Sequence, residues 1–506
     1  MARLTVTGDD DADLLYLSAG FGRDGAGELS DDSATARYEW TTAAGRAATA
    51  IGPSGAISVN LSDRPSGRAE TLTLAVTEGT TLSVEADRPS IRVGLLAGDG
   101  PPGAAFDHML AREDRFRVDG AGDVRLFGDA VMAVDGDRGR ADVFLFAGTG
   151  GRQAAGDFWL VPATVFQVRM GDDDLRIESR GAVQVWGDVA STVDKVDYDA
   201  ALLRAGDDRL DARDALEGVR RPDAPVLVGD VGHLGRGWLL RGGDDLLIAP
   251  REAAGALAGD VLLADGLSRL YCGDDVLRGG RGDDLLFGDV QDVLEPRLHL
   301  RPGADLLRGG RGDDALYGDA REDGPETVLL GPRAAGGDRL YGGAGRDLAQ
   351  GGWGDDRVFG GGGRDRLHGE HGDDRIRGDG GADRLWGGRG NDRLEGGGDD
   401  DRLLGAAGND RLFGGAGADL LHGGAGRDRL AGGEGADRFL LRGGGGRDVA
   451  VDFDPARDWL SAPRGLGPMQ VEETARGMLI SVRGASMLLL GVDERELDRA
   501  DPDWLG

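Results

Sequence analysis

With 506 residues the chain is long enough for several domains, but 93 glycines and only 5% aromatic residues are unlike ordinary globular domains. The 91 acidic residues exceed the 59 basic ones, and the net charge of −32 disfavours nucleic acid and anionic membranes while it favours multivalent cations. The single cysteine, Cys272, excludes an intramolecular disulfide, and no apolar run approaches the roughly 18 residues of a membrane-spanning helix.

Residues 1–118 are predicted to form a β-rich N-terminal region. The opening run MARLTVTGDDDADLL has no long apolar core behind basic residues, so an N-terminal secretory signal is not predicted. Apolar and mostly polar residues then alternate near residues 57–61, 72–76, 82–84 and 91–95. This alternation is typical of half-buried strands, which could form either a sandwich or an N-terminal cap.

Residues 119–335 carry fragments of a glycine- and aspartate-rich pattern. A tag of apolar residue, any residue, Gly, Asp and Val or Ala recurs, and its last three steps are near 30 residues. Looser echoes place Asp208 and Asp245 just before apolar residues. We expect a degenerate β-solenoid with inserted loops near 290–302 and 320–335. Separate globular folds with chance Gly-Asp turns are the alternative.

The pattern becomes strictly regular between residues 336 and 440, where a unit of nine residues repeats eleven times from Gly342. Every unit starts with glycine, and its eighth residue is Leu, Ile, Val or Phe in ten of the eleven units, with Ala349 as the exception. The sixth residue is always aspartate: Asp347, Asp356, Asp365, Asp374, Asp383, Asp392, Asp401, Asp410, Asp419, Asp428 and Asp437.

The residue types of this unit dictate its geometry. Glycine allows positive φ and close backbone approach, so GGxG forms a tight turn, and the following x-apolar-x forms a short strand with its central side chain inward. Two units make one coil of a flattened parallel β-helix, and equivalent turns lie about 4.8 Å apart. Aspartates stacked at that spacing repel one another unless cations lie between them. Carboxylates and turn carbonyls are hard oxygen donors, which suit Ca²⁺ better than Zn²⁺ or Mg²⁺.

The unit GGxGxDxUx, where U is a large apolar residue, resembles the nonapeptide of RTX, or hemolysin-type, calcium-binding proteins. The resemblance implies an all-β protein with a parallel β-roll that binds multiple Ca²⁺ ions. The eleven aspartates would be ligands, helped by turn carbonyls, with about nine gaps between stacked turns. Upstream fragments of the register add five candidate ligands: Asp275, Asp284, Asp305, Asp314 and Asp338. Asp399 replaces the fourth glycine of its unit and is expected to weaken the adjacent site, while Glu370, Asp379 and Ala406 replace second glycines.

Residues 441–506 are predicted to form a C-terminal cap. The segment contains the alternating run MLISVRG, the apolar run MLLLGVD and the charged end ERELDRADPDWLG. A solenoid needs such a cap because its edge strands would otherwise pair with other chains. The segment is also similar to the C-terminal region of RTX proteins, which implies an uncleaved signal for the type I secretion machinery.

These features predict a secreted, extracellular bacterial protein that is exported without a signal peptide and folds when Ca²⁺ binds. One alternative is an adhesin or surface-associated structural protein with a cell-surface or glycan partner. Trp40, Trp159 and Trp186 are candidate stacking residues for it, although packing in the core explains these scattered tryptophans equally well. The other is an RTX-carried hydrolase with a site in residues 1–270.

No catalytic residue is predicted, and the chain is not expected to be an enzyme. The sequence has no HExxH motif, and GPSGA around Ser54 is not GxSxG. Cys272 lies within a repeat turn, which disfavours a role as a nucleophile. His368, His371 and His422 occupy variable positions of the repeat and are expected to face solvent rather than bind zinc.

Overall fold

A computed structural model describes residues 201–212, 226–234, 238–251, 254–264, 269–293, 299–320, 328–329, 336–442, 446–462, 470–482 and 484–499. Before residue 201 it describes the backbone of separate strands and a few single residues. The chain divides into two compact units. The first comprises Met1–Gly280, Asp289–Arg301 and Arg321–Leu330, and the second comprises Arg281–Gly288, Pro302–Ala320 and Gly331–Gly506.

The first unit begins with eight strands, and the segments with alternating apolar residues are among them. Their bounds are β1 (Ala2–Thr7), β2 (Tyr16–Ala19), β3 (Ala36–Thr41), β4 (Ala47–Gly52), β5 (Ala56–Leu61), β6 (Glu70–Val76), β7 (Thr81–Ala86) and β8 (Ile91–Ala97). Antiparallel pairs join β1 to β5 and β7, β4 to β3 and β5, and β2 to β6. Parallel pairing starts with β6–β8, so the region leads into a parallel solenoid.

The rest of the first unit is a parallel solenoid with four sheets. One sheet contains β9 (Arg115–Gly120), β12 (Val143–Gly148), β16 (Asp174–Ser179), β20 (Arg209–Asp211), β24 (Leu246–Ile248) and β28 (Val276–Arg278). A second contains β10 (Val124–Phe127), β13 (Arg152–Ala155), β17 (Val183–Trp186), β21 (Val226–Val228) and β25 (Ala256–Ala258). A third contains β11 (Ala130–Met132), β14 (Phe158–Val161), β18 (Val189–Thr192), β22 (Val231–Leu234), β26 (Val261–Ala264) and β30 (Val290–Val293). The fourth contains β15 (Gln167–Arg169), β19 (Ala201–Arg204), β23 (Trp238–Arg241), β27 (Arg269–Tyr271), β31 (His299–Arg301) and β34 (Val328–Leu329).

These sheets explain the step of about 30 residues between tags, because one coil of this unit carries four strands. Leu227 pairs with Leu257, and Leu270 pairs with Leu300, in register one coil apart. The stretch near 290–302 was expected to be an inserted loop, but it carries β30 and β31, each continuing a parallel sheet. Within the described residues, the longer coil is therefore widened by strands as well as by loops.

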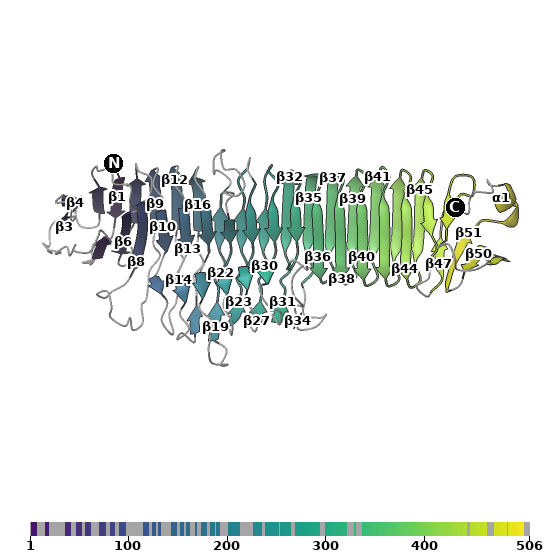
Figure 1. The fold of residues 1–506 in the computed structure, drawn as a ribbon, viewed down its shortest axis with the longest axis horizontal. Coiled ribbons are helices and arrows are strands. Elements are labelled where there is room, and N and C mark those ends of the chain that lie inside the picture. Colours follow the sequence, from purple (N-terminus) through teal and green to yellow (C-terminus); the bar gives the residue numbers. More distant parts are fainter. Residues whose placement is uncertain are drawn as a thin grey trace. The chain divides into compact units, whose positions relative to one another are not determined.

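The second unit is a flattened roll with two strands in each regular coil. One sheet contains β29 (Leu285–Phe287), β33 (Ala315–Tyr317), β36 (Leu348–Trp353), β38 (Arg366–His371), β40 (Arg384–Arg389), β42 (Arg402–Ala407), β44 (Leu420–Ala425), β46 (Arg438–Leu440) and β48 (Trp459–Ser461). The other contains β32 (Leu306–Arg311), β35 (Arg339–Gly345), β37 (Arg357–Gly363), β39 (Arg375–Gly380), β41 (Arg393–Gly398), β43 (Arg411–Ala416), β45 (Arg429–Glu434) and β47 (Asp448–Ala450). Figure 1 shows the strands of this unit side by side in green.

The observed register confirms the predicted parallel β-roll. Leu367 pairs with Leu385 and Leu385 with Leu403, so strands in one sheet are 18 residues apart. The strands are longer than the predicted three residues because turn residues also pair, as Glu370 does with Gly388. Each coil thus bonds to its neighbours through both its strands and its turns.

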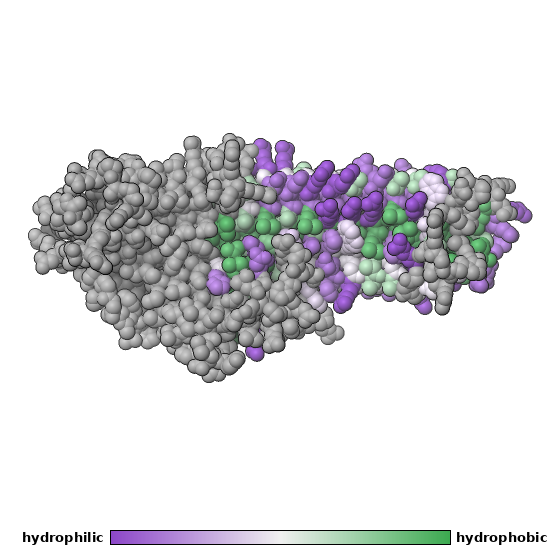
Figure 2. Space-filling model, in the orientation of Figure 1, coloured by the Kyte–Doolittle hydropathy of each residue, from purple (hydrophilic) through white to green (hydrophobic). Residues whose placement is uncertain are grey.

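Eighth-position side chains form the core of the roll. Leu367, Leu385 and Leu394 are fully buried, and Ala349, the exception in the repeat, is buried as well. Their neighbours on the strands are arginines and other residues that are exposed or half-buried. Hydrophilic residues accordingly cover much of the visible face of the second unit (Figure 2).

Replacing Leu385 by alanine should lower the stability of the roll by about 2–5 kcal/mol, because a buried leucine leaves a cavity. Leu404→Ala is the matched control, since Leu404 is half-buried on a neighbouring strand. Urea denaturation in calcium buffer, followed by circular dichroism, measures both effects. Equal losses in the two variants would contradict the assignment of the core.

The described end of the second unit replaces parallel coils with antiparallel strands. β51 (Ala485–Leu490) pairs in parallel with β47, whereas β50 (Gly477–Val482) and β49 (Gln470–Thr474) follow in antiparallel pairs. The short helix α1 (Glu494–Arg499) comes last. None of the helices in the described part of the chain is long and apolar enough to span a membrane.

Candidate metal centre

The sixth-position aspartates connect each turn of the roll to the next turn on the same edge. The backbone N–H of Asp365 donates to Oδ1 of Asp383 at 2.8 Å, and that of Asp383 donates to Oδ1 of Asp401 at 2.8 Å. The other edge repeats the bond, for example from Asp374 N–H to Oδ1 of Asp392 at 2.9 Å. The result is a ladder of carboxylates along each edge, with one rung in every coil.

The second oxygen of each carboxylate has no such bond. All eleven aspartates are at most 2% exposed. Buried Oδ2 atoms without a hydrogen-bond partner belong to Asp347, Asp356, Asp365, Asp374, Asp383, Asp392, Asp401, Asp410, Asp419, Asp428 and Asp437. A buried carboxylate oxygen that lacks a partner is costly, so a row of them indicates a group that is bound there.

The first glycine of each unit makes room for this oxygen. A Cβ on Gly378 would collide with Oδ2 of Asp383 and lie 2.5 Å from the carbonyl oxygen of Gly396, one coil further on. A Cβ on Gly387 would likewise meet Oδ2 of Asp392 and, at 2.6 Å, the carbonyl oxygen of Gly405. Carboxylate and carbonyl oxygens of successive coils therefore gather beside a position where no side chain fits.

Without a cation, burial makes these carboxyls weak acids. Burial raises the pKa of Asp383 to about 7, of Asp401 to about 8 and of Asp374 to about 9. Neighbouring carboxylates raise these pKa values further, whereas the hydrogen bond from the aspartate N–H of the preceding coil lowers them. A divalent cation would reverse this balance because it favours the charged form.

The donor set fits calcium. The gathered atoms are carboxylate and backbone carbonyl oxygens, and Ca²⁺ takes six to eight such oxygens in flexible geometry. The sixth-position aspartates would hold the ion together with carbonyls of the glycine turns. The ion would supply the positive charge that the stacked carboxylates lack.

The five upstream candidates form the same kind of bond within their own units. Each is at most 2% exposed: Asp275, Asp284, Asp305, Asp314 and Asp338. In the first unit, Asp275 Oδ1 accepts from Asp245 N–H at 2.7 Å. In the second, Asp314 Oδ1 accepts from Asp284 N–H at 2.8 Å and Asp338 Oδ1 from Asp305 N–H at 2.7 Å. The rungs stay in register even though these coils are longer.

Two further rungs at the end of the roll were missed by the nine-residue count. Asp448 Oδ1 accepts from Asp428 N–H at 3.1 Å, and Asp458 Oδ1 accepts from Asp437 N–H at 3.0 Å. Both are buried, but they follow their partners by 20 and 21 residues rather than 18. The sequence does contain a signal for both aspartates, because an apolar residue follows each by two positions, as in the regular repeat.

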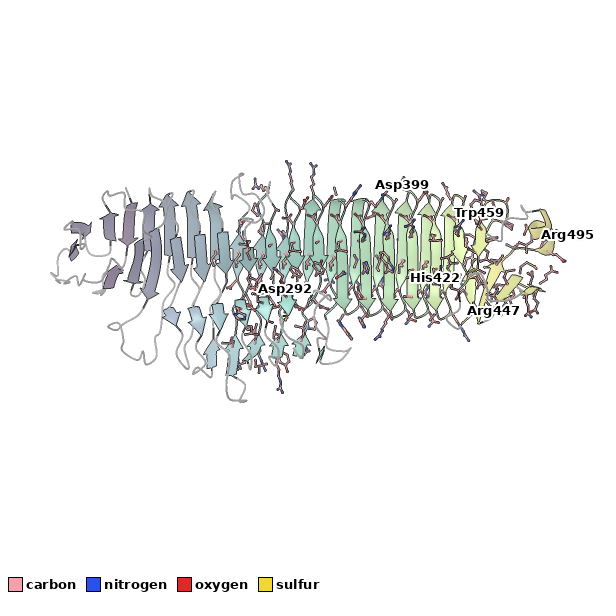
Figure 3. All side chains as sticks on the ribbon, in the orientation of Figure 1. Asp292, Asp399, His422, Arg447, Trp459 and Arg495 are labelled. Atoms are coloured by element: carbon pink, nitrogen blue, oxygen red, sulfur yellow. The ribbon has the colours of Figure 1, made fainter. Side chains whose placement is uncertain are left out.

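The four residues that replace glycines of the repeat have the positive φ angle that is typical of glycine. Glu370, Asp379, Asp399 and Ala406 have φ between 72° and 79° and are the non-glycine residues with positive φ in the described part of the chain. Figure 3 shows Asp399 at the edge of the roll. The carboxylate ladder beside Asp399 is intact. Asp383 N–H donates to Oδ1 of Asp401, and Asp401 N–H donates to Oδ1 of Asp419, both at 2.8 Å. The substitution therefore strains the turn locally without breaking the carboxylate row.

Asp399→Gly should stabilise the calcium-bound roll by about 1 kcal/mol, because a non-glycine residue in this region costs about 1–3 kcal/mol and aspartate tolerates it better than most. Asp400→Asn removes the same charge from an exposed neighbour without changing the backbone preference. The thermal midpoint in saturating Ca²⁺ distinguishes the two variants. A gain of similar size in Asp400→Asn would assign the effect to charge.

The histidines were expected to face solvent, but they are half-buried. His368 stacks on Trp386 with ring centroids 4.4 Å apart, and His371 stacks on Trp353 at 3.9 Å. Burial lowers the pKa of His368 and of His422. For His368 and His371 the reason is the tryptophan ring that stacks on each from the neighbouring coil, whereas His422 pairs in register with Leu404.

The fold and the turns together define a parallel β-roll with stacked Gly/Asp turns built for a hard divalent cation. Residues 273–292, 298–320, 334–367, 368–403 and 404–439 match the model of the RTX calcium-binding nonapeptide repeat. This part of the chain therefore consists of RTX calcium-binding repeats, which confirms the predicted resemblance and implies that Ca²⁺ is the cation. The comparison with curated proteins finds no match.

Proposed function

We propose that the chain is a secreted protein whose β-roll folds when extracellular Ca²⁺ binds between its stacked turns. The observation that supports this most directly is the row of eleven buried Oδ2 atoms without hydrogen-bond partners. These oxygens come together only when successive coils stack. Binding to sites that exist only in the folded chain contributes its free energy to folding.

The charge of the chain supports the same coupling. At a net charge of −32, unfolded segments repel one another, and stacking the aspartates adds to that repulsion. Extracellular calcium modules bind with dissociation constants of about 0.1–1 mM, far above cytosolic calcium. On this proposal the chain stays largely unfolded inside the cell and folds outside it.

Export through a type I secretion machinery is part of the proposal. It rests on the similarity of residues 441–506 to the C-terminal region of RTX proteins. An unfolded chain suits passage through a channel, and the roll needs no disulfide to fold afterwards, since Cys272 is the only cysteine. Loss of export on deletion of residues 441–506, with export of the intact chain, would support this part.

The alternative role as an adhesin or surface scaffold has one favourable observation. Trp353–His371 and His368–Trp386 form stacked aromatic pairs on the roll, and such rings can also stack against sugars. The side chains of the earlier candidates, Trp40, Trp159 and Trp186, lie outside the described residues. Calcium-dependent retention on glycan arrays by the intact chain, lost in Trp386→Ala, would favour this role.

A Ca²⁺ titration of the full-length chain tests the folding switch. Far-UV circular dichroism should show a cooperative coil-to-β transition near millimolar Ca²⁺, and equal Mg²⁺ should leave the chain largely unfolded, because Mg²⁺ demands a stricter octahedral geometry and dehydrates reluctantly. A chain that is fully folded in chelator at neutral pH would contradict the switch, while leaving the calcium-binding repeats in place.

A further inference from the structure

A second group of metal-ligating side chains lies in the first unit, beside the turn that carries Asp275. One carboxylate oxygen each of Asp260 and Asp289 and the sulfur of Cys272 all lie within 4.8 Å of one another. Both aspartates are 0% exposed, and Cys272 is half-buried. Asp260 and Asp289 each lie at a turn just before a strand of the third sheet, a turn that we call a corner of the coil. Cys272 lies just after a strand of the fourth sheet, and stacking of the coils brings the three residues together.

The two aspartates occupy equivalent corners of successive coils. Asp260 precedes β26, and Asp289 precedes β30, as parts of the recurring Gly-Asp tag. The backbone N–H of Val261 donates to the carbonyl oxygen of Asp289 at 2.9 Å, so the corners are held in register. Their carboxyl groups are therefore stacked inside the coil rather than spread on its surface.

Cys272 stands where the preceding coil has Gly242. Each residue ends a strand of the same sheet, after β27 and β23 respectively, and each is followed by a turn glycine. A Cβ on Gly242 would collide with Oδ1 of Asp260. This position therefore faces the corner aspartate of the following coil, and among the coils that the structure describes Cys272 is the one residue that places a ligating side chain there.

The buried carboxyl group of Asp260 is incompletely satisfied. Its Oδ1 accepts from the backbone N–H of Gly273 at 3.2 Å, but its Oδ2 is buried without a hydrogen-bond partner. A fully buried carboxylate oxygen in this state indicates a bound group.

We propose that Asp260, Cys272 and Asp289 bind one zinc-class divalent transition-metal ion. A thiolate is a soft ligand that selects Zn²⁺ and similar ions over Ca²⁺ and Mg²⁺, which prefer oxygen alone. Three protein ligands leave one position of a tetrahedral ion for water. This donor set differs from the all-oxygen turns of the RTX repeats, so the chain would bind two classes of metal through different donor sets.

Cobalt(II) is a suitable probe because bonding to sulfur produces charge-transfer absorption in the near ultraviolet. The full-length chain is freed of metal with chelator, saturated with Ca²⁺ and titrated with Co²⁺. The expected result is one equivalent of cobalt with sulfur-to-metal absorption that Zn²⁺ abolishes and excess Ca²⁺ does not. Binding without this absorption, or complete displacement by Ca²⁺, would overturn the proposal.

Cys272→Gly is the sharpest variant, because it reproduces the residue that the preceding coil already accommodates. It should abolish the absorption and weaken cobalt binding by at least roughly tenfold, since even loss of an outer-shell partner has about that effect. Asp400→Asn, at an exposed position of the second unit outside the proposed ligands, is the control and should leave cobalt binding unchanged. Unchanged affinity in Cys272→Gly would refute the site.

Alkylation of the unmodified chain gives a readout that requires no variant. Zn²⁺ should slow the reaction of Cys272 with iodoacetamide in saturating Ca²⁺, because a metal-bound thiolate is shielded. Equal alkylation rates with and without Zn²⁺ would also refute the proposal. Both experiments are carried out at saturating Ca²⁺, so failure of the calcium switch would not be mistaken for failure of this site.

Discussion

Asp401→Asn is expected to raise the Ca²⁺ concentration at the folding midpoint by about tenfold, which corresponds to about 1.4 kcal/mol. Asparagine keeps an oxygen that can accept from Asp383 N–H, now 2.8 Å from Oδ1, but it removes the charge. It also supplies an amide donor where the structure has an Oδ2 without a partner. The variant therefore tests the charge of a ladder rung with little change in shape.

The adjacent residue provides a matched control. Asp400 is exposed, and its Oδ1 accepts from the N–H of Ala418 at 2.8 Å. Asp400→Asn changes the net charge by the same amount and should shift the midpoint far less, because an exposed charge is screened. Calcium titrations followed by circular dichroism, with bound calcium counted by equilibrium dialysis, compare the two. Equal shifts would mean that overall charge, and not the ladder, governs the affinity.

The second large effect is a pH dependence that reverses between chelator and calcium. Burial raises the pKa of Asp347 and Asp410 to about 7 and that of Asp374 to about 9 in the folded, calcium-free roll. In the unfolded chain these groups return to a pKa of about 3.9. The folded state therefore binds more protons between these values, and in chelator its stability is greatest below about pH 4.

The calcium-free roll should accordingly lose stability as pH rises from about 4, and the loss should level off as the folded-state pKa values of about 6 to 9 are passed. Each carboxyl contributes up to about 1.4 kcal/mol per pH unit between its two pKa values. In saturating Ca²⁺ the sign reverses, because the ion binds deprotonated carboxylates and is displaced by acid.

Far-UV spectra between pH 4 and pH 9, recorded in chelator and in Ca²⁺, would measure this reversal. In chelator, a mildly acidic pH should therefore support part of the β-structure that calcium supports at neutral pH. If chelator-treated protein gained β-structure as pH rose, the aspartates would not be buried in the calcium-free fold as described.

Much of the roll is predictable because each coil touches only its neighbours. An apolar residue at position eight and glycines in the turn suffice for one unit, and repetition of the unit sets the register. Leu385 between Leu367 and Leu403 follows directly from the period. The same locality made the aspartate rows predictable, since a fixed period of 18 residues stacks identical positions.

A fixed sequence period does not predict which aspartates pair where the coils differ in length. Asp245 joins Asp275 over 30 residues, while Asp305 joins Asp338 over 33, and no constant step in the sequence connects both pairs. Extra strands such as β30 and β31 widen the coil, and hydrogen bonding between corners restores the register. Sequence spacing alone cannot reveal which distant corners are stacked.

The sequence by itself determined the β-roll, its calcium chemistry and the regular carboxylate rows, because these depend on contacts between adjacent identical units. Only the tertiary structure decided which irregular coils meet. It brought Cys272 beside Asp260 and Asp289, and it added Asp448 and Asp458 to the ends of the ladders. The physical reason is that hydrogen bonds between coils align positions in space whatever length of chain separates them.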